Sequence, residues 1–191
     1  MNLGKRYLRL KSKLKLDYLL TETQSIALIN LKGNKCKEIN LSILNESLNQ
    51  DDYEFILDVN NALLNLPKTK SKTIFRNFNF SNEEFQNASS FFKTNVGKVI
   101  KFSTFLSCTK SKIFAGKQDY NFVIQINLNN ESTGVDIELL LSYAEIIDAE
   151  KEIIYPNNTC FKIVRINMKK YIKVVLAEIP YTENSILVQK F

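Results

Sequence analysis

The sequence contains no histidine and no tryptophan, and it has only three cysteines, three prolines and five glycines among 191 residues. Without histidine, neither a Ser-His-Asp nor a Cys-His mechanism is available, and histidine-ligated metal chemistry is equally closed. The cysteines Cys36, Cys108 and Cys160 are an odd number without a CxxC pair, so they predict neither a zinc site nor a complete disulfide framework. Any catalysis must therefore use carboxylates, hydroxyls, lysines or arginines, and no metal is expected.

Long apolar segments are also missing. No run of about 18 uncharged apolar residues occurs, and the N-terminus lacks the apolar block that a secretory signal needs. Apolar residues make up 45% of the chain and charged residues 24%, which excludes a disordered or collagen-like protein. We expect a soluble chain that forms one domain, or two closely packed lobes, around a sizeable core.

The net charge of +6 is concentrated at the N-terminus. Residues 1–16 contain six basic residues and no acidic one, whereas the other 20 basic residues are balanced by 20 acidic residues. A nucleic-acid-binding surface usually spreads basic residues over the folded body, so specific nucleic-acid binding is not expected. We expect residues 1–16 to form a solvated basic arm, and contact of this arm with anionic lipid or an acidic partner is the less favoured alternative.

The first part of the sequence has helical periodicity. Between residues 17 and 70, apolar side chains recur at helical spacing and predict three helices. Their periodic positions lie in residues 19–29, 39–48 and 55–64. Residues 32–35, around a Gly-Asn pair, are expected to separate the first two helices; residues 49–52 supply an N-cap-like cluster before the third, and Pro67 ends it.

The second part has the texture of strands. From Thr73 onward, short β-branched and aromatic segments predict a largely antiparallel β core. These segments are residues 73–78, 98–105, 121–128, 135–141, 152–155, 160–166 and 171–179. One further helix is expected over residues 81–92, where Ser81 and Glu84 form a capping box.

The sequence thus predicts an α+β fold in which helices pack on a β core. We divide the chain into a basic arm (residues 1–16), a helical lobe (residues 17–70) and a β-rich core (residues 71–191), all within one compact domain. Residues 68–72 are too short to act as a free linker.

Arg76 is the first candidate functional residue. Lysine outnumbers arginine 22 to 4, so an arginine in this background is more often chemically required. Arg76 lies between Phe75 and Phe78 in an apolar strand, where its guanidinium needs a fixed anion such as a phosphate or a carboxylate. The alternatives are a solvated arginine on an edge strand and a buried salt bridge.

Ser107, Cys108 and Thr109 form the second candidate. They follow Phe105 and Leu106 at the end of a predicted strand. Hydroxyl groups at such a place can hold a ligand by hydrogen bonds, or they can cap a following helix. Taken alone, the pattern favours capping.

Glu150 and Glu152 form the third candidate. In an extended segment, residues two apart share a face, so both carboxylates are expected to point the same way just before the apolar residues 153–155. Neighbouring carboxylates repel each other and need a cationic or hydroxylic partner, which suits a site that stabilises developing positive charge. The alternative is a solvated, charged turn.

In this order and context, the three motifs resemble those of the mono-ADP-ribosyltransferase family of the Arg-Ser-Glu class, which includes bacterial toxins and vertebrate ecto-enzymes. The family has an arginine in an apolar strand, a Ser-Thr-Ser-like motif after an aromatic residue, and Glu-x-Glu before a short apolar strand. This chain departs from that pattern at Asn77, where glycine is usual, and at Cys108, within the Ser-Thr-Ser-like triplet. The resemblance covers nearly the whole chain after residue 16.

The resemblance implies a split β-sandwich core that binds NAD as a co-substrate, preceded by the helical lobe. Arg76 would hold the NAD phosphates, Ser107 would orient Glu152 and the nicotinamide ribose, and Glu152 would bind the ribose 2′-hydroxyl and stabilise the cation formed when nicotinamide leaves. Asn77, Cys108 and Thr109 would complete the NAD site, and no metal is required.

The resemblance further implies transfer of ADP-ribose to an arginine of a protein acceptor, with Glu150 and Ile147 facing that acceptor. Actin and small GTPases are both compatible acceptors. An NAD glycohydrolase with the same site and a catalytically inactive binding module are the alternatives. A secreted or translocated effector or toxin is the expected localisation, and a cytoplasmic protein is the alternative.

Overall fold

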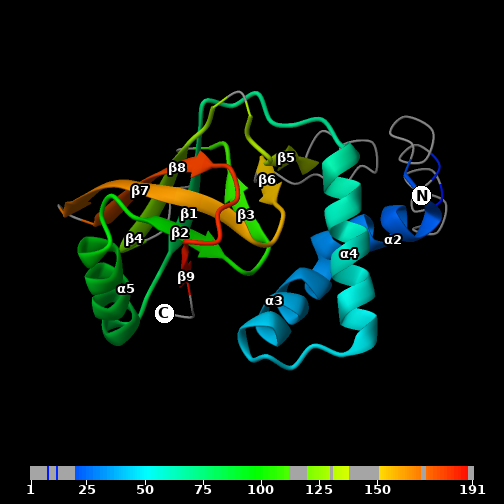
Figure 1. The fold of residues 1–191 in the computed structure, drawn as a ribbon, viewed down its shortest axis with the longest axis horizontal. Coiled ribbons are helices and arrows are strands. Elements are labelled where there is room, and N and C mark those ends of the chain that lie inside the picture. The colour runs from blue at the N-terminus through cyan, green and yellow to red at the C-terminus, as the bar shows by residue number, and fades with distance from the viewer. Residues whose placement is uncertain are drawn as a thin grey trace.

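The structure is a computed structural model that describes residues 20–111, 120–129, 131–137, 151–168 and 171–188, together with Leu8 and Ser12. Figure 1 shows three helices (α2, α3 and α4) beside one end of a twisted sheet and a further helix (α5) at its other end. The expected α+β architecture is confirmed. Most of the basic arm, residues 1–16, lies outside the described residues.

The described part of the helical lobe contains three α-helices. They are α2 (Glu22–Asn30), α3 (Cys36–Leu44) and α4 (Gln50–Asn65). Capping boxes begin α2, with Thr21 and Gln24, and α4, with Asn49 and Asp52, because each pair satisfies backbone N–H groups that have no partner within the helix.

The break predicted at residues 32–35 is absent. The π-helical segment η1 (Leu31–Lys35) connects α2 to α3, so the chain remains helical through Gly33. A glycine weakens a helix without necessarily ending it. Leu31, at the start of η1, is 1% exposed within the core of the lobe, and its burial helps hold the segment in place.

Within the described residues, nine strands form one open sheet in the order β5-β6-β3-β1-β4-β8-β7-β2-β9. Their bounds are β1 (Thr73–Phe78), β2 (Val99–Phe102), β3 (Leu106–Thr109), β4 (Phe122–Asn127), β5 (Val135–Asp136), β6 (Glu152–Tyr155), β7 (Thr159–Met168), β8 (Ile172–Ile179) and β9 (Ile186–Val188). Neighbours are antiparallel except for the pairs β4–β8 and β2–β9. The mainly antiparallel β core is confirmed. Its strands are hydrogen-bonded into one continuous sheet.

The structure adds two strands to those predicted. A bend at residues 103–104 separates β2 from β3, so Ser107 to Thr109 belong to a strand of their own. The short strand β9 pairs with β2. Helix α5 (Asn82–Thr94) has the capping box of Ser81 and Glu84 that the sequence predicts.

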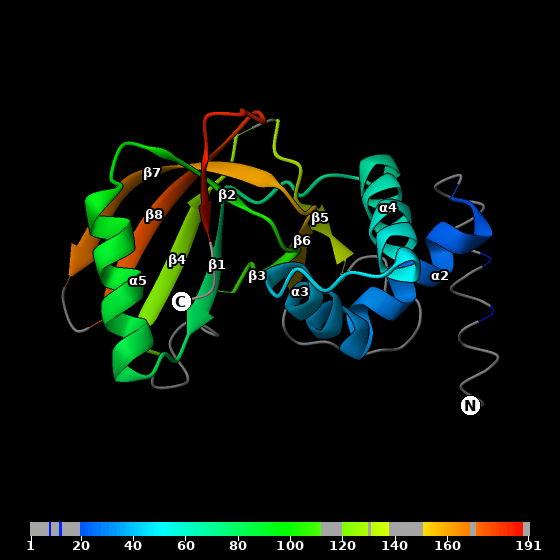
Figure 2. The ribbon, with the colours of Figure 1, turned by 60° about the horizontal axis from the view of Figure 1, so that its bottom comes forward.

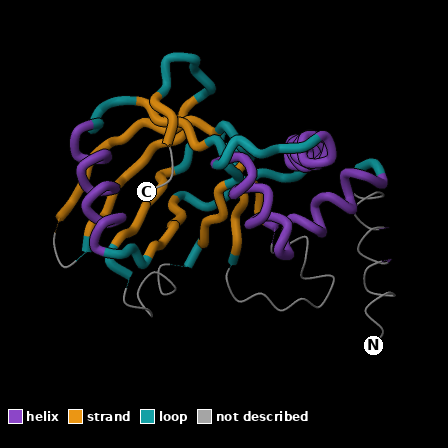
Figure 3. The backbone as a smooth tube through the Cα atoms, turned by 90° about the horizontal axis from the view of Figure 1, so that it is seen from below, coloured by secondary structure: helices purple, strands orange, loops and turns teal. Residues whose placement is uncertain are grey.

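Two hydrophobic cores hold the molecule together. The first joins the helical lobe to one edge of the sheet, through residues such as Leu63 of α4, Val135 of β5 and Ile154 of β6. The second lies within the sheet and beneath α5, where the rings of Phe92 and Phe122 are 5.6 Å apart. Figures 2 and 3 show the lobe and α5 at opposite ends of the sheet. None of the described helices is long and apolar enough to cross a membrane.

Adjacent leucines of α4 provide a test of this packing. Leu63 is fully buried and Leu64 is 65% exposed. We expect Leu63→Ala to lower the free energy of unfolding by about 2–5 kcal/mol, because it removes buried methyl groups and leaves a cavity. Leu64→Ala is the matched control and should change it by less than about 0.5 kcal/mol. Chemical denaturation measures both, and equal effects would contradict the packing described for α4.

Candidate active site

Arg76, Ser107 and Glu152 come together because their strands are neighbours. In the order β6-β3-β1, the short strand β3 lies between the strands that carry Glu152 and Arg76. Thr109 of β3 is opposite Glu152 of β6 on one side and Phe75 of β1 on the other. Three segments far apart in the sequence therefore converge at one place in the sheet.

Glu152 is held on both carboxylate oxygens. The hydroxyl of Ser107 donates a hydrogen bond to Oε1, and the ammonium of Lys32, from η1, donates one to Oε2. Only 8% of Glu152 is exposed, so the alternative of a solvated turn is excluded for this residue. Lys32 was not among the residues singled out in the sequence, because nothing in its local pattern distinguishes it from other lysines.

Arg76 lies on the interior strand β1, which excludes the edge-strand alternative. Its Nη1 donates a hydrogen bond to the backbone carbonyl of Ser107 at 2.8 Å, and its guanidinium carbon lies 5.3 Å from the centroid of the Phe78 ring. Its Nε is buried and has no hydrogen-bond partner within the described part of the chain. A buried, unsatisfied donor on a cation is suited to an anionic ligand.

Asn77, Cys108 and Thr109 line a small hollow of about 150 Å³ beside Arg76 and Ser107. The Oδ1 atom of Asn77 is buried without a partner among the described residues, so it can accept a hydrogen bond from a ligand. Thr109 accepts one from the Ser111 amide at 3.0 Å. The Cys108 side chain is buried, and burial raises its pKa to about 12, so this thiol is neutral.

A larger cleft of about 670 Å³ lies between the lobe and the sheet, within the usual range of about 300–1,000 Å³ for small-molecule sites. Lys32, Cys36 and Asn40 line it from the lobe, and Arg76 and Glu152 line it from the sheet. The aromatic residues Phe78 and Phe80 also line the cleft, and their rings stack with centroids 4.7 Å apart.

Asn40 attaches the lobe to the strand that carries Ser107. Its side-chain amide donates to the carbonyl of Phe105 at 2.9 Å and accepts from the amide of Phe105 at 3.0 Å. This pair of hydrogen bonds satisfies both backbone groups of Phe105 immediately before β3 begins, and it therefore holds the start of β3 against α3.

Glu150 and Ile147 lie outside the described residues. Lys151, between the two glutamates, has a left-handed backbone with φ of 51°, so the extended geometry expected there is wrong at this residue. Non-glycine residues rarely adopt this conformation, which costs conformational energy. The backbone carbonyl of Lys151 accepts a hydrogen bond from the Lys110 amide at 3.0 Å, which fixes the entry into β6.

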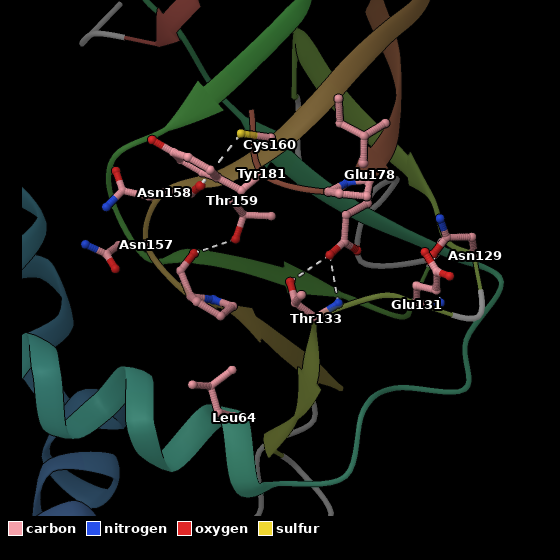
Figure 4. A pocket seen from close by; sticks show the side chains of 13 residues that line it. Leu64, Asn129, Glu131, Thr133, Asn157, Asn158, Thr159, Cys160, Glu178 and Tyr181 are labelled. Carbon is pink, nitrogen blue, oxygen red and sulfur yellow. Dashed lines mark hydrogen bonds between the residues drawn. The ribbon is translucent and has the colours of Figure 1, made fainter. Parts of the chain in front are cut away.

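A second hollow of about 470 Å³ lies beyond the other end of β6, where Figure 4 shows Glu178 beside Thr133. The buried carboxylate of Glu178 accepts hydrogen bonds from the Ser132 hydroxyl at 2.6 Å and from the amide and hydroxyl of Thr133 at 2.7 and 2.6 Å. Burial and this carboxylate raise the pKa of Tyr155. Glu178 is thus satisfied internally and anchors the segment before β5.

Among the described residues, no group of three or more His, Cys, Asp or Glu side chains is placed to hold a metal ion. The polar groups that line the cleft include the carboxylate of Glu152, the hydroxyl of Ser107 and the cationic groups of Lys32 and Arg76.

Cys36 reports on the charge of Glu152. Burial raises the pKa of the Cys36 thiol and the Glu152 carboxylate raises it further, whereas Arg76 and Lys32 act in the opposite direction. Glu152→Gln should therefore lower this pKa and speed alkylation of Cys36 severalfold at about pH 8, because the thiolate is the reactive form. Peptide-resolved mass spectrometry measures the rate, with the buried Cys160 as the internal control. An unchanged rate for Cys36 would contradict the proximity of the two groups.

Comparison with known proteins identifies the family. A model of the family "ADP-ribosyltransferase exoenzyme" matches residues 5–184. No curated protein sequence matches the chain. The C3 exoenzyme of Clostridium limosum is similar in structure, with a TM-score of 0.60 and 15% identity over 94% of this chain and 95% of the other.

Two larger toxin components also share the fold. The enzymatic component C2-I of the Clostridium botulinum C2 toxin has a TM-score of 0.67 and 20% identity, over 88% of this chain and 47% of C2-I. BECa of Clostridium perfringens, whose structure contains NADH, has a TM-score of 0.66 and 18% identity, over 91% of this chain and 48% of BECa. The chain spans about half the length of these two proteins. Because the family model covers nearly all of its length, the chain belongs to the ADP-ribosyltransferase exoenzyme family, as the motifs predict.

Proposed function

We propose that this chain is an NAD-dependent mono-ADP-ribosyltransferase that transfers ADP-ribose to an arginine of a protein acceptor and releases nicotinamide. The observation that carries the proposal is the placement of Glu152. Its buried carboxylate accepts a hydrogen bond from Ser107 in a cleft that also contains the incompletely satisfied guanidinium of Arg76. Membership of a family that uses NAD as its substrate supports the same conclusion.

The cleft suits a dinucleotide with a diphosphate at its centre. Its lining contains the cations Lys32, Lys37 and Arg76 against the carboxylates of Glu84 and Glu152. The planar guanidinium of Arg76 can direct its free N–H groups to phosphate oxygens. The neighbouring rings of Phe78 and Phe80 offer apolar surface to the flat base and nicotinamide groups.

The chemistry requires a negative charge beside the nicotinamide ribose. As the bond between nicotinamide and ribose breaks, positive charge develops on the sugar, as it does in glycoside hydrolysis. Glu152 stabilises that charge and accepts a hydrogen bond from the ribose 2′-hydroxyl, while Ser107 holds the carboxylate in orientation. In this cleft, the partial exclusion of water strengthens the electrostatic effect.

Specificity for arginine rests on Glu150 and on the family resemblance. A carboxylate beside an acceptor guanidinium can orient it and remove a proton, so that a neutral nitrogen attacks the sugar. Ile147 would contact the acceptor protein next to Glu150. Actin and small GTPases are the acceptor classes to test, and delivery as a secreted or translocated toxin agrees with the family.

Labelled NAD tests the reaction directly. We expect the purified protein to release nicotinamide and to label a protein in a cell lysate, and Glu152→Gln should lower both rates by roughly a hundredfold or more. Glu131→Gln, at an exposed residue outside the cleft, is the matched control and should behave as the wild type. Nicotinamide release without labelling would indicate a glycohydrolase, and no consumption of NAD would indicate a binding module.

The acceptor assignment has a separate test. Glu150→Gln should abolish labelling of arginine but leave measurable NAD hydrolysis, because water needs no carboxylate to orient it as an acceptor. Hydroxylamine, which cleaves arginine-linked ADP-ribose, identifies the linkage on the wild-type product. Retained arginine labelling in the variant would overturn the role of Glu150.

A further inference from the structure

Lys32 forms an ion pair with the carboxylate on which the proposed reaction depends. The side chains of Lys32 and Glu152 are 16% and 11% exposed, so solvent screens the pair only partly. Because Ser107 engages the other carboxylate oxygen, Glu152 has a hydrogen-bond donor on each oxygen in the free protein.

The two lysines of the π-helical segment η1 have different ion-pair partners. Lys32 reaches Glu152, whereas the Nζ atom of Lys35 lies 3.2 Å from Oδ1 of Asp52, within the lobe. Lys32 lines the cleft and Lys35 does not. Single π-helical turns are frequent at functional sites, and this one directs one lysine into the candidate active site.

The pair in the free protein conflicts with the proposed chemistry. An ammonium group beside Glu152 neutralises the carboxylate and repels the positive charge that develops on the ribose. For Glu152 to act on the sugar, Lys32 must leave it or share it. The incoming substrate brings a diphosphate into the same cleft, and a diphosphate is a stronger anionic partner for an ammonium than a single carboxylate.

We infer that Lys32 exchanges partners when NAD binds: it leaves Glu152 for the diphosphate of the donor and thereby frees the carboxylate for the ribose. The inference rests on the proposed function, because it assumes that NAD occupies this cleft. Nη1 of Arg76 already donates a hydrogen bond to the carbonyl of Ser107. A second cation, from the lobe, therefore complements the contact of Arg76 with the phosphates. The donor would thus activate Glu152 by its own binding.

Titration calorimetry with ADP-ribose tests the exchange without relying on catalysis, because this ligand carries the diphosphate but has no nicotinamide to release. Glu152→Gln removes the carboxylate that holds Lys32, so contact of Lys32 with the diphosphate no longer has to replace this ion pair. Lys32→Met should then weaken binding by roughly tenfold in the Glu152→Gln background, the effect of one charge-assisted hydrogen bond, and by less when Glu152 is present.

Two variants control for charge and folding. Lys35→Met removes the same charge from the same segment and breaks the ion pair with Asp52. Because Lys35 does not line the cleft, this variant should leave the affinity for ADP-ribose unchanged. Lys32→Arg retains the charge and should retain most of the affinity. Thermal unfolding of each variant, measured beforehand, shows that the comparison is made between folded proteins.

The outcomes separate the inference from the proposed function. If Lys32→Met leaves the affinity unchanged, or lowers it equally with and without Glu152, the exchange is refuted while the proposed function stands. Failure of the wild type to bind ADP-ribose and to consume NAD refutes both. A larger loss in the Glu152→Gln background, absent from Lys35→Met, supports the exchange.

Discussion

The side-chain amide of Asn40 determines where the strand of the candidate site begins. It satisfies both backbone polar groups of Phe105, and β3 starts at the next residue. Because β3 lies between β1 and β6, its position decides how Ser107 stands relative to Arg76 and Glu152. The geometry of the site is therefore set jointly by the helical lobe and by the register of the sheet.

The two buried glutamates, Glu178 and Glu152, have different surroundings. Glu178 is buried, and its carboxylate accepts three hydrogen bonds from Ser132 and Thr133. These bonds hold the loop before β5 in place. Glu152 is nearly as buried, but it faces a cleft, and one of its partners is a lysine with a flexible side chain. Removal of a buried charge destabilises a protein most where the partners of that charge cannot rearrange. Glu178 is therefore suited to a structural role and Glu152 to a reactive one.

The sequence was most informative about the kinds of residue in the site and least informative about how they are connected. The capping box at Ser81 and the strand that carries Arg76 depend on short-range patterns, and both are confirmed in the structure. The pairing of Thr109 with Glu152 depends on residues 43 positions apart, which no local pattern encodes. Lys32 was missed for the same reason: its partner is 120 residues away, and the π-helical segment that directs it looked like a break between helices. Glu150 and Ile147 stay predictions.

The two hydrophobic cores meet at the cleft. Leu31 belongs to the core of the lobe, whereas Phe102 and Leu106 belong to the core of the sheet, yet all three line the same cleft. Because the core of the lobe also includes Val135 and Ile154 of the sheet, a movement of the lobe that changes the width of the cleft also disturbs that core. The width of the cleft, and with it the access of a ligand to Glu152, therefore depends on the packing between the lobe and the β5–β6 edge.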